Sequence, residues 1–326
     1  MACGSGRTSQ GERETVGALR SGVTVVVPVY MSGATLPELI SRIGTVLAPL
    51  GDYEVILVDD GSPDATWPTV AQLAAQTPDV RGLRLGRNFG QHSALVAGVR
   101  AATYSRTVTL DDDLQNPPEE IPRMLAAMEE QGADVIYGVP EKTEHAFYRR
   151  LASRITRTAL GSGLGVDSAP ELSSFRAFRT DIRDAFSGDL GTGVSLDALL
   201  TWGSSRFGSI KVRHDPRTVG ASNYTFFKLL RFAIDTTTGY STVPLRLASL
   251  LGLLAGGLGV LVLLWAILRP MITGESVPGF PFLASIIAIF SGAQMLTLGI
   301  IGEYLARMHF RIMRKPTYVV AEETSD

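Results

Sequence analysis

Thr109-Leu110-Asp111-Asp112-Asp113-Leu114-Gln115-Asn116-Pro117-Pro118 places three carboxylates between an apolar run and a Pro-Pro turn. The apolar residues before the acids predict a β-strand over 106–110. Because side chains alternate along a strand, we expect Asp111 and Asp113 to face one side, and Asp112 to face away and tolerate replacement. Two such carboxylates suit Mg²⁺ or Mn²⁺, which prefer hard oxygen ligands together with substrate phosphates. A solvated acidic turn is the alternative for this stretch taken alone.

Strand and helix patterns alternate between this stretch and the N-terminus. Strand patterns cover 23–29, 53–58, 80–85 and 106–110, and helical patterns cover 35–47, 66–76 and 90–102. This order predicts an α/β, Rossmann-like domain over 23–220, with a parallel sheet covered by helices on both faces. In such sheets the ligand crevice lies at the carboxyl ends of the strands.

A second acidic motif, Asp59-Asp60-Gly61-Ser62, follows the strand predicted over 53–58. Gly61 and Pro63 supply a turn that lets Asp59 or Asp60 face the crevice. Two acidic strand ends in one half of the sheet favour a crevice for a nucleotide and a metal ion. Neither a Walker lysine motif nor a dinucleotide-binding glycine motif is found, so those two classes are not supported.

Apolar residues concentrate late in the chain, which has 326 residues, 45% of them hydrophobic. The mean hydropathy is +0.17. The runs 247–268 and 280–301 are each about 22 residues long, enough to cross a hydrocarbon core of roughly 30 Å. We therefore expect two transmembrane helices within 243–306, with a buried core hairpin as the alternative.

Basic residues flank the outer ends of this pair: Lys228, Arg231, Arg246, Arg307, Arg311, Arg314 and Lys315. The positive-inside rule predicts a multi-pass plasma (inner) membrane protein whose catalytic domain and both termini are cytoplasmic, 307–326 forming the C-terminal tail. The segment 221–242 contains Tyr224 to Ile234, which has the pattern of an amphipathic helix in the interface. A simple stop before the first span is the alternative. Residues 315–320 suggest a short strand that pairs with the sheet or with a neighbouring protomer.

The remaining composition excludes other classes. Residues 1–22 are rich in Gly, Ser and Arg, which is typical of a disordered tail, and they hold the single cysteine, Cys3. One cysteine forms no internal disulfide, which agrees with a reducing compartment. The net charge of −2, without a basic stripe, argues against nucleic acid as a partner.

Several motifs together resemble the family 2 glycosyltransferases of GT-A fold, and most closely their polyprenyl-phosphate group. They are Val25-Val26-Val27-Pro28-Val29-Tyr30, Val58-Asp59-Asp60-Gly61-Ser62-Pro63-Asp64, Arg87-Asn88-Phe89-Gly90-Gln91-His92-Ser93-Ala94, Leu110 through Pro122, Ser173-Ser174-Phe175-Arg176-Ala177-Phe178-Arg179, and Arg217 with Gly220, Ser222 and Tyr224. The resemblance covers about residues 23 to 320.

The resemblance implies roles for individual residues on the donor side. Asp111, Asp113 and Gln115 would hold Mg²⁺ or Mn²⁺ on the donor pyrophosphate. The implied contacts to the donor come from Pro28, Tyr30, Asp59 or Asp60, Arg87 and Asn88, and Asp112 is counted with them. For His92, also near the donor, a structural role is favoured over a catalytic one.

On the acceptor side, a polyprenyl phosphate is mostly a dianion at neutral pH, so the site needs cations more than a strong base. Arg176 and Arg217 lie in resembling motifs, with Ser222 beside Arg217. Arg149, Arg150 and Arg154 would add to them, or else form a solvated helix face near anionic lipid. Glu171 is the favoured acid facing the acceptor, with Asp167 as the alternative.

We therefore expect an inverting glycosyltransferase that moves a sugar from a nucleotide diphosphate, UDP first, to a polyprenyl phosphate, and that forms a homo-oligomer. Its catalytic residues would be Asp111, Asp113, Glu171 and Arg176. Met31-Ser32-Gly33 departs from the family pattern and leaves the nucleotide open, and Asn223 stands where a lysine is common. One alternative is a processive polysaccharide synthase, which the missing Gln-x-x-Arg-Trp segment disfavours. The other is a silent membrane scaffold that binds nucleotide.

Overall fold

The computed structural model describes residues 19–141, 173–188, 190–191, 194–215, 279–312 and 316–324, with scattered positions between 250 and 272. Most of the predicted tail 1–22, the amphipathic segment within 221–242 and most of the run 247–268 lie outside the described residues.

The described residues include one eight-stranded sheet, in the order β7-β5-β6-β4-β1-β2-β3-β8. Its strands are β1 (Arg20–Val29), β2 (Tyr53–Asp59), β3 (Val80–Leu85), β4 (Tyr104–Thr109), β5 (Val135–Pro140), β6 (Arg176–Arg179), β7 (Phe207–Val212) and β8 (Val320–Glu323). The neighbours β4, β1, β2 and β3 are parallel, as predicted. Strand β6 pairs antiparallel with β4 and β5, and β8 pairs antiparallel with β3.

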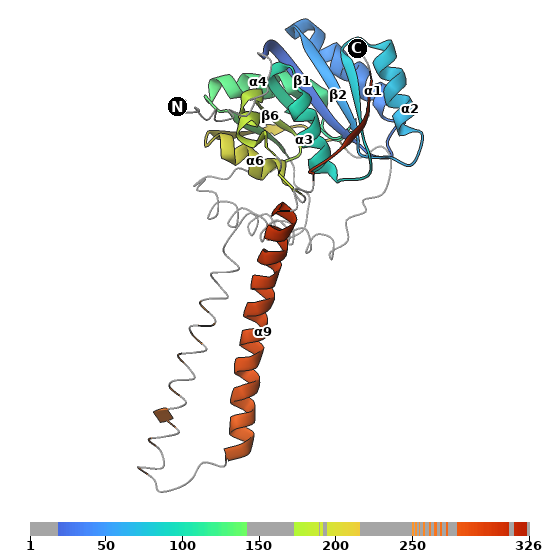
Figure 1. Ribbon diagram of the computed structural model, residues 1–326. Helices are drawn as coiled ribbons and strands as arrows, with labels where there is room; N and C mark the ends of the chain where they lie inside the picture. The colour runs from blue at the N-terminus through green and yellow to red at the C-terminus, as the bar shows by residue number, and fades with distance from the viewer. Residues whose placement is uncertain are drawn as a thin grey trace, which may run out of the picture.

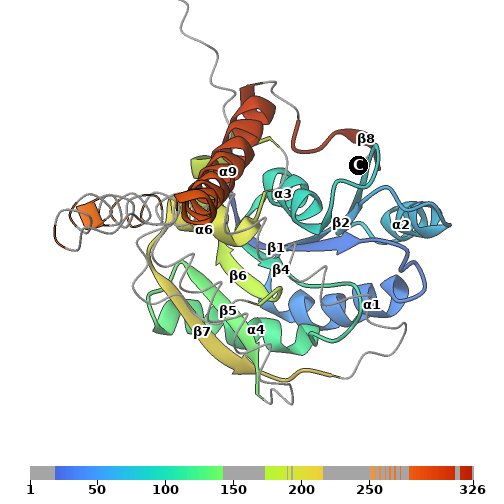
Figure 2. The ribbon, with the colours of Figure 1, turned by 90° about the horizontal axis from the view of Figure 1, so that it is seen from below.

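Helices cover both faces of the sheet (Figure 2). On one face, α1 (Leu36–Leu47), α2 (Thr66–Gln76) and α4 (Ile121–Glu130) contribute to a core that includes Leu39, Val70 and Met124. On the other face lie α3 (Gln91–Ala101), the 3-10 helix η3 (Thr180–Phe186) and α6 (Leu196–Gly203). Two shorter 3-10 helices, η1 (Ala48–Leu50) and η2 (Pro118–Glu120), complete the connections. The predicted α/β architecture is thus confirmed.

Burial explains why the central strands have apolar runs instead of alternating patterns. Val25, Val26 and Val27 of β1 are all fully buried. A parallel strand covered by helices on both faces has no solvent side, so every position favours an apolar, β-branched residue. The predicted strand 80–85 and helix 66–76 have the bounds that the sequence indicates, and the other strands and helices predicted between residues 23 and 110 shift by one to three residues.

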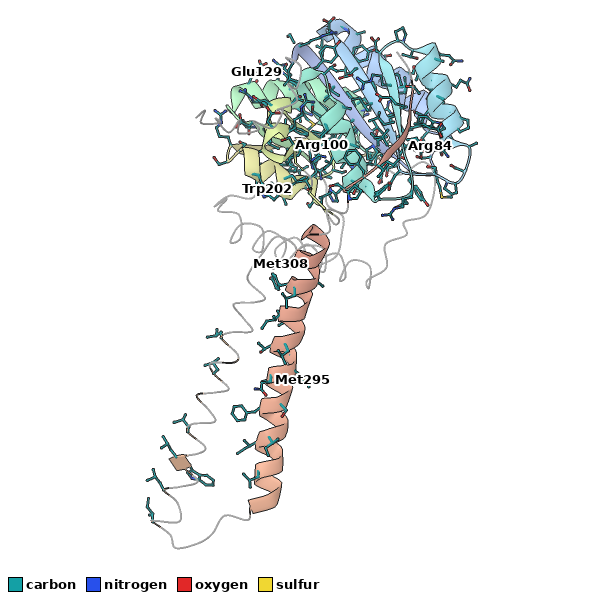
Figure 3. All side chains as sticks on the ribbon, viewed as in Figure 1. Arg84, Arg100, Glu129, Trp202, Met295 and Met308 are labelled. Carbon is teal, nitrogen blue, oxygen red and sulfur yellow. The ribbon has the colours of Figure 1, made fainter. Side chains whose placement is uncertain are left out.

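Helix α9 (Gly279–Ile312) extends away from the α/β domain (Figure 1). Large apolar side chains along it are exposed, among them Leu283, Ile287, Met295, Leu298 and Met308. Figure 3 marks Met295 and Met308 on this helix. Within the described part of the chain, no helix meets the length and hydropathy required for a membrane span. After α9 the chain returns to the sheet as β8, so a short strand near the predicted segment 315–320 pairs with the sheet.

A substitution at Gly98 of α3 tests how closely this helix packs on β1. A Cβ at this position would lie 2.3 Å from Val26 Cγ1 and 3.0 Å from Val58 Cγ2. We expect Gly98→Ala to lower the free energy of unfolding by about 1–3 kcal/mol, because overpacking outweighs the gain in helix propensity. Thermal unfolding measures the change. Gly188→Ala, where the added Cβ meets nothing within 4 Å, is the control. Equal stability of both variants would contradict this account of the packing.

Candidate active site

The carboxyl ends of β1, β2 and β4 meet at one edge of the sheet. Val29 is in register with Asp59, and Val26 is in register with Thr109. The backbone N–H of Asp60 donates to the Val29 carbonyl, and that of Leu110 donates to the Val26 carbonyl. The segments after these strands, which contain the two acidic motifs, therefore lie side by side, as the sequence indicates.

The three aspartates Asp111, Asp112 and Asp113 lie beyond the end of strand β4. Strand β4 ends at Thr109, and the chain then turns, with Leu114 at a φ of 60°. Strand alternation is therefore the wrong guide for Asp111 to Asp113. Asp112 and Asp113 line the same pocket of about 380 Å³, with residues 30–35, 64–66 and 69. The assignment of Asp111 and Asp113 to the metal stays a prediction.

Asp111 contacts two other elements. Its carboxylate accepts hydrogen bonds from Ser174 Oγ at 2.5 Å and from Gln91 Nε2 at 2.7 Å. Burial raises the pKa of Asp111, although the bond from Ser174 opposes the rise. Asp111 thus joins the start of α3 to the segment before β6.

Asp112 holds the loop after β1. Its carboxylate accepts a hydrogen bond from the backbone N–H of Tyr30 at 3.3 Å and one from Ser32 Oγ. Its backbone carbonyl accepts from Thr35 Oγ1 at 2.7 Å. Burial raises the pKa of Asp112 to about 6. These contacts disagree with the expectation that Asp112 tolerates replacement, because the side chain orders the loop that lines the pocket.

The acidic motif after β2, Asp59-Asp60-Gly61-Ser62, also binds backbone groups. The carboxylate of Asp60 accepts hydrogen bonds from the N–H groups of Phe89 and Gly90 at 2.7 and 2.8 Å. Asp59 accepts from the N–H of Ser62 at 3.1 Å and is fully buried. Gly61 adopts a φ of +67°, and a Cβ there would lie 2.5 Å from the Arg87 carbonyl carbon, so the loops after β2 and β3 are in close contact.

The other residues predicted to contact the nucleotide-sugar differ in how far they are exposed to solvent. Pro28 is buried within β1, whereas Tyr30 is 46% exposed and lines the pocket. Arg87 and Asn88 are exposed in the loop after β3, where the Arg87 guanidinium lies 4.3 Å from the centre of the Phe89 ring. Gln115 donates its backbone N–H to Asp113 at 3.1 Å.

Arg176 lies in a buried ion pair. Its guanidinium binds both carboxylate oxygens of Asp197, at 2.7 and 2.9 Å, and donates to the Ser174 carbonyl at 3.0 Å. Tyr137 Oη donates to the same carboxylate at 3.0 Å. Burial opposes ionisation of Asp197, but the attraction and hydrogen bonds of Arg176 outweigh it and lower the pKa of Asp197. This geometry favours Arg176 as a residue that positions the Ser174 segment, over direct contact with phosphate.

His92 has a structural contact. Its Nδ1 accepts a hydrogen bond from the backbone N–H of Leu196 at 3.2 Å, and burial lowers its pKa. The neutral ring therefore joins the start of α3 to the start of α6, which agrees with the structural reading of this histidine.

Five of the predicted acceptor-side residues lie outside the described residues: Arg149, Arg150, Arg154, Arg217 and Ser222. The same holds for Glu171 and Asp167. Sequence reasoning gave no role to Ser174, Gln91, Tyr137 and Asp197. Ser174 and Gln91 stand inside the quoted motifs, which could have drawn attention to them, whereas no local signal pointed to Asp197.

The side chains after β4 offer the oxygen ligands that a hard divalent cation prefers. The described residues contain no group of three or more His, Cys, Asp or Glu side chains arranged to hold a metal ion by themselves. Mg²⁺ and Mn²⁺ are usually held by one or two carboxylates together with substrate phosphates, and such a site needs no larger protein cluster. The oxygen atoms of Asp111, Asp113 and Gln115 are of the required chemical type.

A sheet with parallel central strands, and with two acidic motifs beside a polar pocket at their carboxyl ends, has the architecture of a GT-A glycosyltransferase. The sequence matches the model of the glycosyl transferase family 2 over residues 24–184. It is 35% identical to undecaprenyl-phosphate 4-deoxy-4-formamido-L-arabinose transferase of Aeromonas hydrophila, over 91% of this chain and 92% of that protein. The chain therefore belongs to glycosyl transferase family 2, in its group of polyprenyl-phosphate glycosyltransferases.

Solved structures support the fold. Glucosyl-3-phosphoglycerate synthase from Mycobacterium tuberculosis, in complex with Mn²⁺, uridine diphosphate and phosphoglyceric acid, matches with a TM-score of 0.51. It is 20% identical, over 67% of this chain and 76% of that chain. A second mycobacterial protein matches with a TM-score of 0.52 at 19% identity, over 67% of this chain and 73% of that chain.

The buried ion pair generates a stability prediction. Asp197→Ala leaves the charge of Arg176 buried without its partner, so we expect a loss of about 3–5 kcal/mol in unfolding free energy. Asp181→Ala breaks the pair with Arg179, whose side chains are 46% and 54% exposed, and serves as the control. That variant should lose about 1 kcal/mol or less. Denaturant unfolding monitored by tryptophan fluorescence measures both. A loss for Asp197→Ala no larger than for the control would contradict the assignment.

Proposed function

We propose that the chain transfers a sugar, with inversion, from a UDP-sugar to a polyprenyl phosphate at the cytoplasmic face of a membrane, and that the reaction needs Mg²⁺ or Mn²⁺. The observation that carries this proposal is the pocket at the carboxyl edge of the sheet, where Asp112 and Asp113 lie beside Tyr30. A nucleoside diphosphate offers a pyrophosphate for a metal next to the carboxylates, and a flat base for the exposed tyrosine ring.

Hydrogen bonds around the pocket support the donor side of the proposal. Asp112 fixes the backbone of Tyr30, and Asp60 fixes the loop that carries Arg87 and Asn88. Asp111, Asp113 and Gln115 would hold the cation, which, when bound, neutralises the charge that develops on the leaving nucleoside diphosphate. The choice of UDP is supported by a protein of the same fold, the M. tuberculosis synthase solved with Mn²⁺ and uridine diphosphate.

The acceptor side rests on the chemistry of a phosphate monoester and on one relative. The A. hydrophila relative is named as an undecaprenyl-phosphate transferase. In the proposed step, a phosphate oxygen attacks the anomeric carbon, the bond from that carbon to the donor pyrophosphate breaks, and UDP leaves. This single displacement inverts the anomeric configuration. Since the phosphate is mostly a dianion at pH 7, it needs placement more than deprotonation.

Attachment to a membrane is part of the proposal. The exposed apolar side chains along α9 support it, because in water they would form an unusually large hydrophobic surface. The apolar run over 247–268 and the basic residues outside both runs support a two-helix hairpin with the catalytic domain and both termini in the cytoplasm. The crevice would then lie near the depth at which a lipid phosphate emerges.

A donor screen tests the reaction itself. The full chain, purified in detergent, is incubated with undecaprenyl phosphate, Mn²⁺ and UDP-, dTDP- or GDP-sugars, and the lipid products are detected by mass spectrometry. We expect one lipid-linked monosaccharide from a UDP-sugar and loss of product with EDTA. Chains of repeated sugars would support a processive synthase instead. Nucleotide binding without product from any donor would support a silent scaffold.

A pair of aspartate variants tests the metal assignment. We expect Asp113→Asn to lower kcat/KM by about 100-fold or more, because a neutral amide is a much weaker ligand for a divalent cation. Asp184→Asn, which changes an exposed carboxylate in η3 away from the pocket, is the matched control and should retain activity. Binding of Mn²⁺ in the presence of UDP, followed by electron paramagnetic resonance, gives a second readout. Unchanged activity of Asp113→Asn would remove this residue from the metal site.

A further inference from the structure

Asp59 is a buried carboxylate whose charge is incompletely compensated at close range. The residue is fully buried at the end of β2. Its Oδ1 accepts the hydrogen bond from the N–H of Ser62, whereas Oδ2 has no hydrogen-bond donor among the described residues. A buried charge of this kind is costly unless an opposite charge lies nearby.

Arg84 of β3 provides that opposite charge. Its Nε lies 3.7 Å from Asp59 Oδ2, which is an ion pair and not a hydrogen bond. Strand β3 is paired with β2, and Arg84 is directly in register with Asp59. The side chain of Arg84 is 34% exposed, so its position depends on what else it contacts.

Two side chains fix the Arg84 guanidinium from the outer side. Glu322 of β8 accepts a hydrogen bond from Arg84 Nη1 at 2.7 Å through Oε1, and one from Trp67 Nε1 at 2.8 Å through Oε2. The guanidinium carbon also lies 5.9 Å from the centre of the Trp67 ring. Figure 3 labels Arg84 beside β8 at the edge of the sheet. Strand β8 is therefore connected to the buried carboxylate of Asp59 through Arg84.

Hydrogen bonds continue from Asp59 into the pocket. Ser62, which donates its N–H to Asp59, accepts a hydrogen bond on Oγ from the N–H of Met31 at 3.0 Å. Met31 has a φ of 55°, a conformation that a residue with a side chain rarely adopts. It follows Tyr30 and lines the same pocket. The turn after Asp59 therefore contributes a hydrogen bond that holds Met31 in this conformation.

We propose that Arg84, oriented by Glu322 of β8, is a positioning residue for the nucleotide: it neutralises Asp59, and Asp59 holds the Ser62 turn that keeps Met31 and Tyr30 in place. This inference deepens the proposed function and rests on it for the identity of the ligand. Neither Arg84 nor Glu322 is among the residues that line the pocket, and the proposed route from both to the pocket runs through Asp59. The consequence is that donor affinity depends on the strand that follows α9.

Arg81 offers a matched control on the same strand. It also binds a glutamate of β8, Glu323, at 3.1 Å, and a second carboxylate, Glu54, at 3.3 Å. Glu54 lies at the start of β2, near the edge of the sheet opposite to the pocket. Arg81→Met therefore removes a comparable contact with β8 without changing Asp59.

Amide hydrogen exchange of the full chain, without nucleotide, tests the positioning itself. We expect Arg84→Met to speed exchange about tenfold in peptides that contain Ser62 and Met31, a mid-range value for coupling through one ion-pair network. Arg81→Met should leave these peptides as in the wild type, and Arg84→Lys should restore most of the protection because a cation remains. Wild-type exchange at Ser62 in Arg84→Met, or the same increase in Arg81→Met, would overturn the proposal.

Kinetics supply the second readout. For Arg84→Met we expect the donor KM to rise about tenfold while kcat and the acceptor KM stay within about twofold, and for Glu322→Gln a smaller change in the same direction. A fall in kcat with an unchanged donor KM would overturn the positioning role. The hydrogen-exchange experiment needs no substrate, so its failure is separate from a failure of the donor screen, which would count against the proposed reaction.

Discussion

The pairing of β1 on both sides is the constraint on which the active site depends. The strand lies between β2 and β4 in parallel register, with its valines buried between two layers of helices. Parallel strands in a shared register end at one edge, so the loops after all three strands must meet there. The positions of the two acidic motifs are thus set by the apolar core of the sheet and only refined by polar contacts.

Carboxylates perform that refinement by binding backbone and hydroxyl groups of neighbouring loops. Asp60 binds the loop after β3, Asp112 binds the loop after β1, and Asp111 binds Gln91 and Ser174. Each acid is therefore attached to an element other than its own. These bonds between neighbouring loops hold the pocket in one geometry before a ligand binds. Less conformational entropy is then lost on binding.

The strands β1 to β4 and the helices between them could be predicted from the sequence because their signals are local, whereas β5, β6 and β7 were not among the predicted elements. Apolar runs and helical spacing are properties of neighbouring residues, and the alternation of strands and helices predicts a parallel sheet. The placement of β1 between β2 and β4 comes from the structure. Within the site, the sequence predicts both acidic motifs at strand ends. It does not predict how Asp111 to Asp113 are oriented, because β4 ends at Thr109 and side chains no longer alternate regularly beyond the strand. Asp197 escaped notice because its pairing with Arg176 depends on how β6 and α6 pack. The contact of Asp112 with Ser32, 80 positions away in the chain, has no local sequence signal for the same reason.

The edge of the sheet at β3 has a consequence for how the molecule is made. Strand β8 covers this edge, yet Arg84 and its partner Glu322 are 238 positions apart in the chain. A ribosome releases residues from the N-terminus onward, so β3 emerges well before the strand that covers it. Until α9 and β8 have been synthesised, the nascent domain presents an unpaired strand to its surroundings, a known starting point for misassembly. Completion of the sheet is thereby tied to completion of the helix that precedes β8.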